Sequence, residues 1–413
     1  MPFIWQFFIF SRLGRLDMQR WGSWPSSSSL ASAALGRSDE EVITLIKNLD
    51  DGFAADILSA FSLTRIKNIV SNPDLDVDKA QSILYEMPRN KIFDLVLEGA
   101  SSVTFSADST ISGVIRYLDV KVDAGVTLTC GGQPTVIICR NLVNDGNIVK
   151  TATGGKGGKG FSTAGDGGDG GGGLIILAKE SVLNNNLISA NGESGEAGTN
   201  GSGLYAPGCP GEHGNVVVIA GDSVGSGGDG GAEYHNYGVG NWGGGGAGEG
   251  NENSGGDGGV CCYLSFNTAD EISSELKKAL VDWYLVNIIG RTPSKKAEFF
   301  DAMGAGGGGG ACETASAYDM GGGGGGGSGG IIIVDSDSIN NQGTIEARGG
   351  DGGDAEDRGT GGGGGGGLIY LFYRSSITEG TLSVDGGVKG SAPNDALGWD
   401  GTAGVAKSVQ VSV

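Results

Sequence analysis

The chain contains few of the residues on which most enzymes and metal sites depend. Its 413 residues include only 2 histidines, and its 6 cysteines form no CxxC pair, so the sequence lacks both a zinc signature and a nucleophile–base pairing. No GxxxxGK[ST] phosphate loop occurs between a strand and a helix. Proline, at 9 residues, is scarce, and glycine follows no strict Gly-X-Y period, which excludes collagen. We therefore expect a protein that is not an enzyme, with no catalytic residue and no required cofactor.

Positive charge and long apolar runs are also lacking. The net charge of −21 opposes binding to nucleic acid and to anionic membranes. The apolar run from Pro2 to Phe10 is too short to span a bilayer, and its arginines follow it, unlike those of a secretory signal. We expect no membrane span and a retained segment that docks into a partner or a sister subunit of a homo-oligomer. The aromatic residues assigned to this attachment are Phe3, Trp5, Phe7, Phe8 and Phe10.

Glycine, by contrast, is abundant, at 84 residues, and is concentrated after residue 150. Its longest runs occupy residues 170–173, 243–246, 306–310, 321–327 and 361–367. Such a composition is often a flexible linker. Here, however, the runs alternate with Ile/Val/Leu segments at regular distances, and glycine lets extended backbones approach closely. We predict ordered layers of polyglycine II type.

A repeat accompanies the glycine runs. Four apolar segments begin at Pro134, Leu174, Ile331 and Leu368, and an apolar residue follows each start at +14: Ile148, Ile188, Ile345 and Leu382. A fixed period indicates stacked supersecondary units, none of which buries its apolar face alone. The fold class predicted is mainly β, a β-solenoid-like stack of strands with glycine layers. Residues 216–219 are interpreted as a further, degenerate copy.

Two segments have helical periodicity instead. Residues 38–100 are predicted to be a small helical domain, because Ser38 and Glu41 form a capping box before apolar residues at helical spacing. Residues 268–304 are predicted to be an inserted helical hairpin, with Gly290 ending its first helix and Pro293 opening its second. The remaining parts are 1–37, a docking segment and linker, and 101–267 and 305–413, the two parts of the glycine-rich stack.

The best candidates for binding are aromatic residues in glycine-rich loops. Exposed aromatic side chains at a tip can stack on sugar rings or dock into a receptor. They are Tyr205, Tyr234, His235, Tyr237, Trp242 and Tyr318. An equally weighted interpretation is that these side chains seal the ends of the glycine layers.

Two weaker signals concern calcium and cysteine. The segment Gly349–Asp354 matches the front half of a calcium-binding nonapeptide, with Asp351 and Asp354 as metal ligands, but the match breaks at Glu356. Cys130 and Cys139 are candidates for a disulfide across adjacent strands, and buried thiols are equally consistent with the sequence.

The stretch from Tyr117 through Gly173 resembles the glycine-rich fibre and adhesin proteins of tailed viruses. It has a strand pair over residues 118–129, an apolar run, the turn Asp145-Gly146-Asn147-Ile148 and then glycine arrays, and the pattern returns over residues 341–350. The resemblance covers roughly residues 103–413 without the helical insert. It implies a polyglycine II body with tip loops that recognise a host surface glycan or protein, and other virion proteins as partners.

The sequence thus predicts a structural and adhesive component of a virion tail fibre or tail tip, located in the virion or at an extracellular or cell surface. One alternative is the subunit of a self-assembling extracellular filament, because the ends of stacked strands are open edges. Another is a depolymerase of surface polysaccharide with paired carboxylates on a groove. Ice binding through a flat glycine face is a third.

Overall fold

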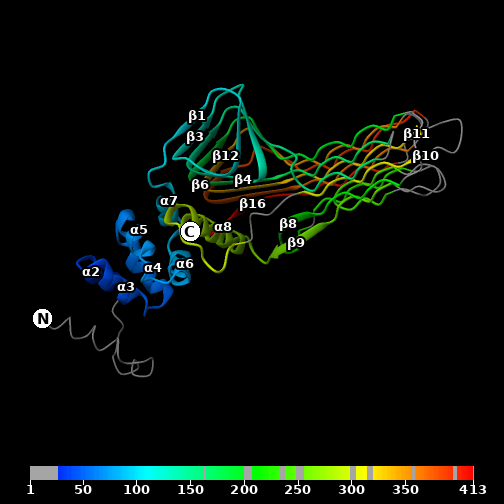
Figure 1. Ribbon diagram of the computed structural model, residues 1–413. Coiled ribbons are helices and arrows are strands. Elements are labelled where there is room, and N and C mark those ends of the chain that lie inside the picture. Colours follow the sequence, from blue (N-terminus) through cyan, green and yellow to red (C-terminus); the bar gives the residue numbers. More distant parts are fainter. Residues whose placement is uncertain are drawn as a thin grey trace. The chain divides into compact units, whose positions relative to one another are not determined.

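Figure 1 shows the computed structural model, which is mainly β, with mostly parallel strands and a smaller number of helices. The structure describes residues 27–160, 164–199, 207–222, 224–231, 238–247, 255–297, 304–313, 320–355, 359–393 and 398–412. The chain divides into two compact units. One comprises residues 1–98 with 276–297, and the other comprises residues 99–275 with 298–413.

The first unit is helical. Ser38 begins α3 with the predicted capping box: its hydroxyl accepts from Glu41 N at 3.3 Å, and the Glu41 carboxylate accepts from Ser38 N at 3.1 Å. Ile57, Ile66 and Phe93 from three of the helices are fully buried or nearly so and belong to the core. The helices are α2 (Ser27–Leu35), α3 (Asp39–Ile46), α4 (Asp51–Ser59), α5 (Leu63–Ser71), α6 (Val77–Glu86) and α7 (Arg89–Leu97).

The predicted hairpin over residues 268–304 is found only in its first half. Helix α8 (Ala269–Tyr284) continues as a π-helical turn, η2 (Leu285–Ile289), and Gly290 ends it with φ of 77°. Residues 290–297 contain no helix, so the second helix does not open at Pro293, and residues 298–303 lie outside the described part. Side chains hold this backbone in place of helical bonds: Asp282 accepts from Ala297 N at 2.6 Å, and Asp78 accepts from Ser294 N at 2.9 Å.

The second unit is built on a 12-stranded sheet. Its strands are β1 (Val103–Phe105), β2 (Ser109–Arg116), β3 (Asp119–Val122), β4 (Thr127–Asn144), β5 (Asn147–Lys150), β6 (Gly173–Asn184), β7 (Leu187–Ser189), β12 (Ile331–Asn341), β13 (Thr344–Glu346), β14 (Leu368–Thr378), β15 (Thr381–Ser383) and β16 (Val405–Gln410). All pairings within it are parallel.

The long strands bend at register shifts and so contribute to more than one row of pairing. Ile137, in the first half of β4, pairs with Ile176 of β6, and Leu142, in its second half, pairs with Val182. Short strands form a further row, in which Ile148 pairs with Ile188, Ile188 with Ile345, and Ile345 with Leu382. The residues predicted at +14 therefore lie in register with one another.

Two sequence-based details need correction. Ile331 pairs with Leu368 and with Gly173, whereas Leu174 pairs with Thr135 and Ile332, so the predicted start at Leu174 is one residue later than the other three. The reason is a register shift, because β6 has an extra residue between Leu177 and Ser181 compared with the facing part of β12. The supposed degenerate copy at residues 216–219 lies in β8 (Gly214–Ile219), which pairs with β9 (Cys261–Phe266) in a separate 2-stranded sheet.

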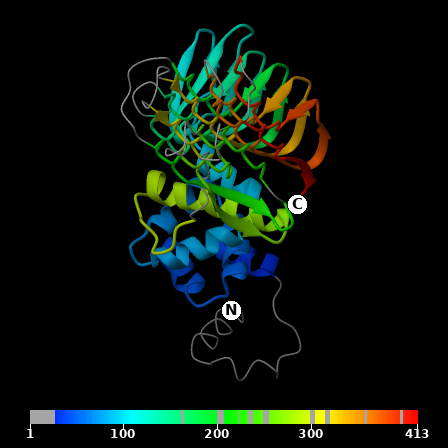
Figure 2. The same cartoon turned by 90° about the vertical axis from the view of Figure 1, so that its right-hand side faces the viewer.

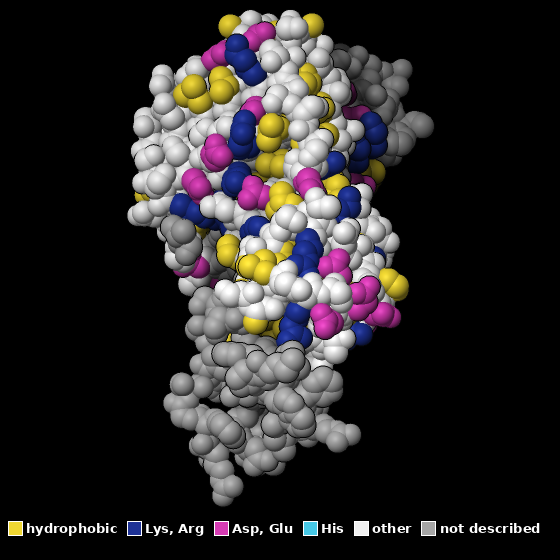
Figure 3. All heavy atoms as spheres, turned by 90° about the vertical axis from the view of Figure 1, so that its left-hand side faces the viewer, with side chains coloured by type: hydrophobic (Ala, Val, Ile, Leu, Met, Phe, Trp, Pro, Cys, Tyr) yellow, Lys and Arg dark blue, Asp and Glu magenta, His cyan; other side chains and the backbone are white. Residues whose placement is uncertain are grey.

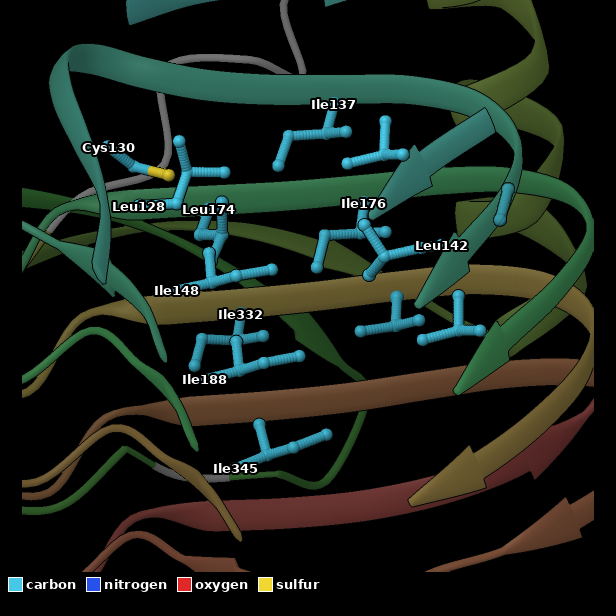
Figure 4. Close-up of a cluster of buried hydrophobic side chains, with 14 of the residues drawn as sticks. Leu128, Cys130, Ile137, Leu142, Ile148, Leu174, Ile176, Ile188, Ile332 and Ile345 are labelled. Atoms are coloured by element: carbon cyan, nitrogen blue, oxygen red, sulfur yellow. The ribbon is translucent and has the colours of Figure 1, made fainter. Parts of the chain in front are cut away.

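The core of this unit lies between the rows of strands. Figure 4 shows Leu128, Ile137, Ile148, Leu174 and Ile176 pointing into one apolar interior, where each is almost completely buried. This burial is the main stabilising contribution in this part of the unit.

A chain of asparagines runs along one corner of the same core. Asn144 donates to Asn184 at 2.7 Å, and Asn184 donates to Asn341 at 2.7 Å, all three being fully buried. Each asparagine amide therefore satisfies the next, which fixes the corner in one geometry. The Asn144 Oδ1 atom, at the end of this chain, has no partner.

Long glycine segments extend from the strands and lie beside one another (Figures 1 and 2). We call them together the glycine bundle, and they are residues 152–160, 164–172, 190–199, 207–213, 224–231, 238–241, 243–247, 255–260, 304–311, 322–330, 347–355, 359–367, 384–393 and 398–404. Backbone hydrogen bonds join them throughout.

The segment 322–330 shows how this bonding works. Residues 322, 325 and 328 donate to segment 304–311, residues 323, 326 and 329 donate to segment 359–367, and residues 324, 327 and 330 donate to segment 190–199. It also accepts bonds from segments 164–172, 243–247 and 347–355. Successive residues thus bond in different directions, with a repeat of three residues.

Four inner segments are enclosed by the others. They are 243–247, 304–311, 322–330 and 359–367, all buried and without a side chain larger than threonine. The outer segments bond each to the next around the perimeter and close on themselves. Their order is 152–160, 164–172, 190–199, 347–355, 384–393, 398–404, 224–231, 238–241, 255–260 and 207–213, which returns to 152–160.

Glycine is needed in the bundle for space. A Cβ on Gly326 would lie 2.0 Å from the carbonyl oxygen of Gly350, and a Cβ on Gly307 would lie 2.1 Å from that of Gly325. Both distances are far below van der Waals contact, so any side chain here would force neighbouring backbones apart. Neither residue has a positive φ, and the constraint is therefore the close approach of backbones.

Candidate binding surface

Most residues predicted to bind or attach lie outside the described part of the structure. This holds for Tyr205, Tyr234, His235, Tyr237 and Tyr318, and also for the N-terminal residues Phe3, Trp5, Phe7, Phe8 and Phe10. Their assignments stay predictions.

Trp242 is described, and it is not available for binding. Its side chain is only 2% exposed, and its indole Nε1 donates to the Gly366 carbonyl at 3.4 Å. Its backbone carbonyl accepts from Gly365 N at 2.9 Å, and its N–H donates to Gly259 at 3.2 Å. Because Trp242 is anchored between glycine segments, its assignment as an exposed receptor contact is wrong, and the sealing interpretation fits this residue.

Asp351 and Asp354 use their carboxylates to hold backbone. Asp351 Oδ1 accepts from Val388 N at 2.9 Å, and Asp354 Oδ1 accepts from Ser391 N at 2.7 Å and from Ser391 Oγ at 2.8 Å. Within the described ranges, no group of three or more His, Cys, Asp or Glu residues is placed to hold a metal ion. The calcium site stays a prediction, and calorimetric titration of calcium into the metal-stripped protein tests it.

The same use of acidic side chains recurs around the perimeter of the bundle. An N–H of an outer segment that has no backbone acceptor donates to a carboxylate on the adjacent outer segment. Asp169 accepts from Gly157 N at 2.8 Å, Asp166 from Gly160 N at 2.8 Å, Asp229 from Gly240 N at 2.7 Å, Asp257 from Val239 N at 2.8 Å, and Asp400 from Lys389 N at 2.8 Å. These acidic residues therefore have a structural task.

Two cysteines and one histidine of this unit are engaged in structure. Cys130 and Cys139 both lie in β4 as buried thiols, so the disulfide across adjacent strands is wrong and the alternative holds. Burial raises the pKa of the Cys130 thiol to about 12, which keeps it neutral and unreactive. His213 Nδ1 accepts from Val260 N at 3.2 Å and is thus engaged in the backbone.

Lys150 is an almost fully buried cation in this unit. It is 2% exposed, and its Nζ donates to Gly132 O at 2.7 Å and to Thr153 Oγ1 at 2.6 Å. Burial lowers the pKa of this amine to about 8. Its partners are neutral oxygens where β5 passes into the glycine bundle, so its task is structural.

Several apolar side chains of the glycine bundle are exposed and were not identified from sequence, among them Val260 on segment 255–260 at 38%. Trp399 and Val388 are each 55% exposed, and Val239 is 48% exposed. Val388 lies on the outer segment 384–393, which is bonded directly to segment 398–404, where Trp399 lies. Only segment 224–231 separates segment 398–404 from segment 238–241, where Val239 lies. We call Val388, Trp399 and Val239 the Trp399 row.

Backbone bonds fix Trp399 in place. Its N–H donates to Asp229 O at 2.9 Å, and its carbonyl accepts from Gly363 N at 3.0 Å, on an inner segment. The N–H thus bonds to the adjacent outer segment and the carbonyl to an inner one, and the side chain is 55% exposed. Asp229 and Asp400 flank it, and the N–H of Lys389, beside Val388, donates to Asp400.

A sequence signal for this surface exists in the glycine arrays. Side chains larger than serine recur every third residue in the outer segments, as in Lys156 and Lys159, Asp166 and Asp169, or Glu193 and Glu196. Those residues are exposed or half-buried, and between the first two pairs Gly158 and Gly168 donate to inner segments. In segment 398–404, glycine recurs at residues 398, 401 and 404, and these positions face the inner segment 359–367. Trp399 falls on a different position of the three-residue repeat and faces outward.

Other surfaces offer less. Asp354, Ala355, Ser391, Ala392 and Pro393 line an open depression of about 500 Å³, and the Asp354 carboxylate and the Ser391 hydroxyl there are bonded to each other. On the face seen in Figure 3, acidic and basic side chains are interspersed and form no single-signed field. A search of the described helices found none whose length and apolarity would suffice to cross a membrane.

Comparisons with protein families, curated proteins and solved structures found no match for this chain.

Proposed function

We propose that this protein is a non-enzymatic structural and adhesive component of a virion tail fibre or tail tip that attaches to a host cell surface. The supporting observation is the glycine bundle, in which outer segments close a hydrogen-bonded perimeter around buried inner segments. Such a backbone lattice would give the stiff, protease-resistant body that an attachment device requires. The charge of −21 and the acidic outer residues favour solubility in an extracellular medium.

We further propose that the β unit is a β-solenoid whose rungs carry polyglycine II layers. Parallel pairing in register along several rows supports the first part. The repeat of three residues in the hydrogen bonds supports the second, because polyglycine II has three residues per turn and is satisfied only by neighbouring chains. The N-terminal segment and helical unit would then attach this body to sister subunits or other virion proteins.

Immunogold electron microscopy tests this function. Antibodies raised against the purified chain are applied to virus particles and cells from the culture that produces it, and labelled protein is added to the same cells. Gold on the tails or fibres of particles, with labelled protein on the cells, is the expected result. Absence of both signals would refute the proposal.

One observation favours a second candidate, a subunit of a cell-surface filament. Among the described strands, β1 pairs only with β3 and β2 only with β4, which leaves their outer edges open to another strand. Gold on cellular filaments in place of particles, and long fibres in micrographs of purified protein, would select this candidate. For the depolymerase alternative, the candidate carboxylates in the sequence are Asp351, Asp354, Glu356 and Asp357. The first two accept from backbone N–H groups, and the other two lie outside the described residues.

A further inference from the structure

We infer that the Trp399 row, on the side of the glycine bundle, binds the uncharged pyranose units of a surface glycan. This inference rests on the proposed adhesive function and names its ligand class and contact residue. It starts from three side chains, Val388, Trp399 and Val239, whose exposure is unusual in a bundle where most outward residues are polar.

The composition of the row fits a sugar better than a protein. The apolar side chains are separated by acidic ones: Asp229 lies on the segment between Trp399 and Val239, and Asp400 follows Trp399. A stable protein interface needs a contiguous desolvated centre within about 1,200 Å² or more of buried surface. A pyranose needs one aromatic face for its C–H groups and a few acceptors for its hydroxyls.

Asp229 and Asp400 supply the acceptors for sugar hydroxyls. Asp229 accepts from Gly240 N at 2.7 Å and Asp400 from Lys389 N at 2.8 Å, in both cases through Oδ1. These bonds orient each carboxylate and do not use Oδ2, which can accept a sugar hydroxyl in a charge-assisted hydrogen bond. The same negative charges repel acidic glycans, so the ligand is an uncharged one.

The site is also rigid before the ligand arrives. The Trp399 backbone bonds to segment 224–231 through its N–H and to segment 359–367 through its carbonyl. A side chain mounted on this backbone loses little freedom on binding, which favours affinity for a small ligand. Repeated sugar units along a glycan would add avidity when several copies of the chain are displayed together.

The experiment measures retention of the full chain on immobilised polysaccharides. The neutral probes are dextran, mannan and galactan, the acidic probe is alginate, and polylysine represents a basic protein. We expect the wild type to be retained by at least one neutral polymer and not by alginate. Trp399→Ala should weaken that retention at least tenfold, and Trp399→Phe, which keeps an aromatic face, should preserve most of it.

Leu264→Ala is the matched control, because Leu264 is an exposed apolar residue on β9, outside the row. It should leave retention unchanged, and equal melting temperatures would show that all variants fold. Retention of Trp399→Ala equal to wild type, or retention by alginate or polylysine alone, would overturn the inference. If labelled wild-type protein coats cells but no neutral polymer retains it, the ligand class is wrong and the adhesive function stands. If it coats neither cells nor particles, the proposed function itself fails.

Discussion

The sheet and the glycine bundle belong to one unit and are held together in different ways. In the sheet, side chains such as Ile137 and Ile176 fill a dry interior, and their burial stabilises the fold. In the inner part of the bundle there are almost no side chains, and backbone bonds to several neighbours take their place. At a buried sheet position, the size and shape of the side chain therefore decide which residue fits. At an inner bundle position, only glycine or another very small residue fits. Substitutions in the two regions should therefore change the free energy of unfolding by different amounts.

The largest effect is expected at an inner glycine of the bundle. Gly326→Ala places a methyl group 2.0 Å from Gly350 O, and relief requires segment 347–355 to move away from segment 322–330. We expect a loss of about 3 kcal/mol or more in the free energy of unfolding, measured by urea titration. Gly131→Ala in the sheet is the control, because its nearest atoms would be 3.8 Å away. Equal stability of the two variants would show that the bundle is not close-packed.

The asparagine chain offers the corresponding test in the sheet. Asn184→Ala removes the acceptor of Asn144 and the donor to Asn341, and it leaves both groups buried. The expected loss is about 2–3 kcal/mol, since each buried polar group without a partner is costly. Asn185→Ala, at an exposed neighbour bonded to Asp145, should cost less than about 0.5 kcal/mol by the same titration. A neutral Asn184→Ala would mean that the chain of amides contributes nothing.

Lys150 lies where the sheet meets the glycine bundle, and the effect of replacing it on stability should depend on pH. Its pKa is about 8 in the folded protein and about 10.4 in an unfolded chain, so holding the charged form costs folding free energy. That cost is fully present below pH 8 and disappears as the pH rises toward 10.4. Lys150→Met should therefore be more stable than wild type by about 1–2 kcal/mol at pH 7, and the difference should shrink by pH 10. A difference that does not change with pH contradicts this account.

The smallest effect is expected at the bundle perimeter. Asp354→Ala removes the acceptor for Ser391 N, whereas Asp354→Asn keeps an oxygen in the same place. We expect Asp354→Ala to lose about 1 kcal/mol or less, and Asp354→Asn to lose less than that. Thermal unfolding of the two variants measures the contribution of the hydrogen bond apart from that of the charge. Equal losses in both variants would assign the effect to charge instead.

Sequence reasoning succeeded where side chains specify partners. Ile148, Ile188, Ile345 and Leu382 were recognised from their spacing, and the structure pairs them because one buried row accepts one kind of residue. The predicted strand start at Leu174 was wrong by one residue, because nothing in the sequence indicates the extra residue at the bend of β6.

In the bundle, only part of the arrangement could be predicted. The outward positions follow from the spacing of Lys156 and Lys159 or Asp166 and Asp169, and the inner segments follow from having only small residues. The order of segments around the perimeter could not be predicted, because glycine has no side chain that would make one neighbouring segment fit better than another. Trp242 was misassigned for this reason: the segments that bury it are distant in the sequence.

The closed perimeter also constrains how such a molecule can evolve. Because bonding directions repeat every three residues, an insertion of one or two residues in a single outer segment would turn every later donor toward the wrong neighbour. Growth in length must come in triplets and in several segments at once, whereas the turns between segments can change freely. Variation among descendants should therefore accumulate in the turns, while the number of triplets per segment changes only in concerted steps.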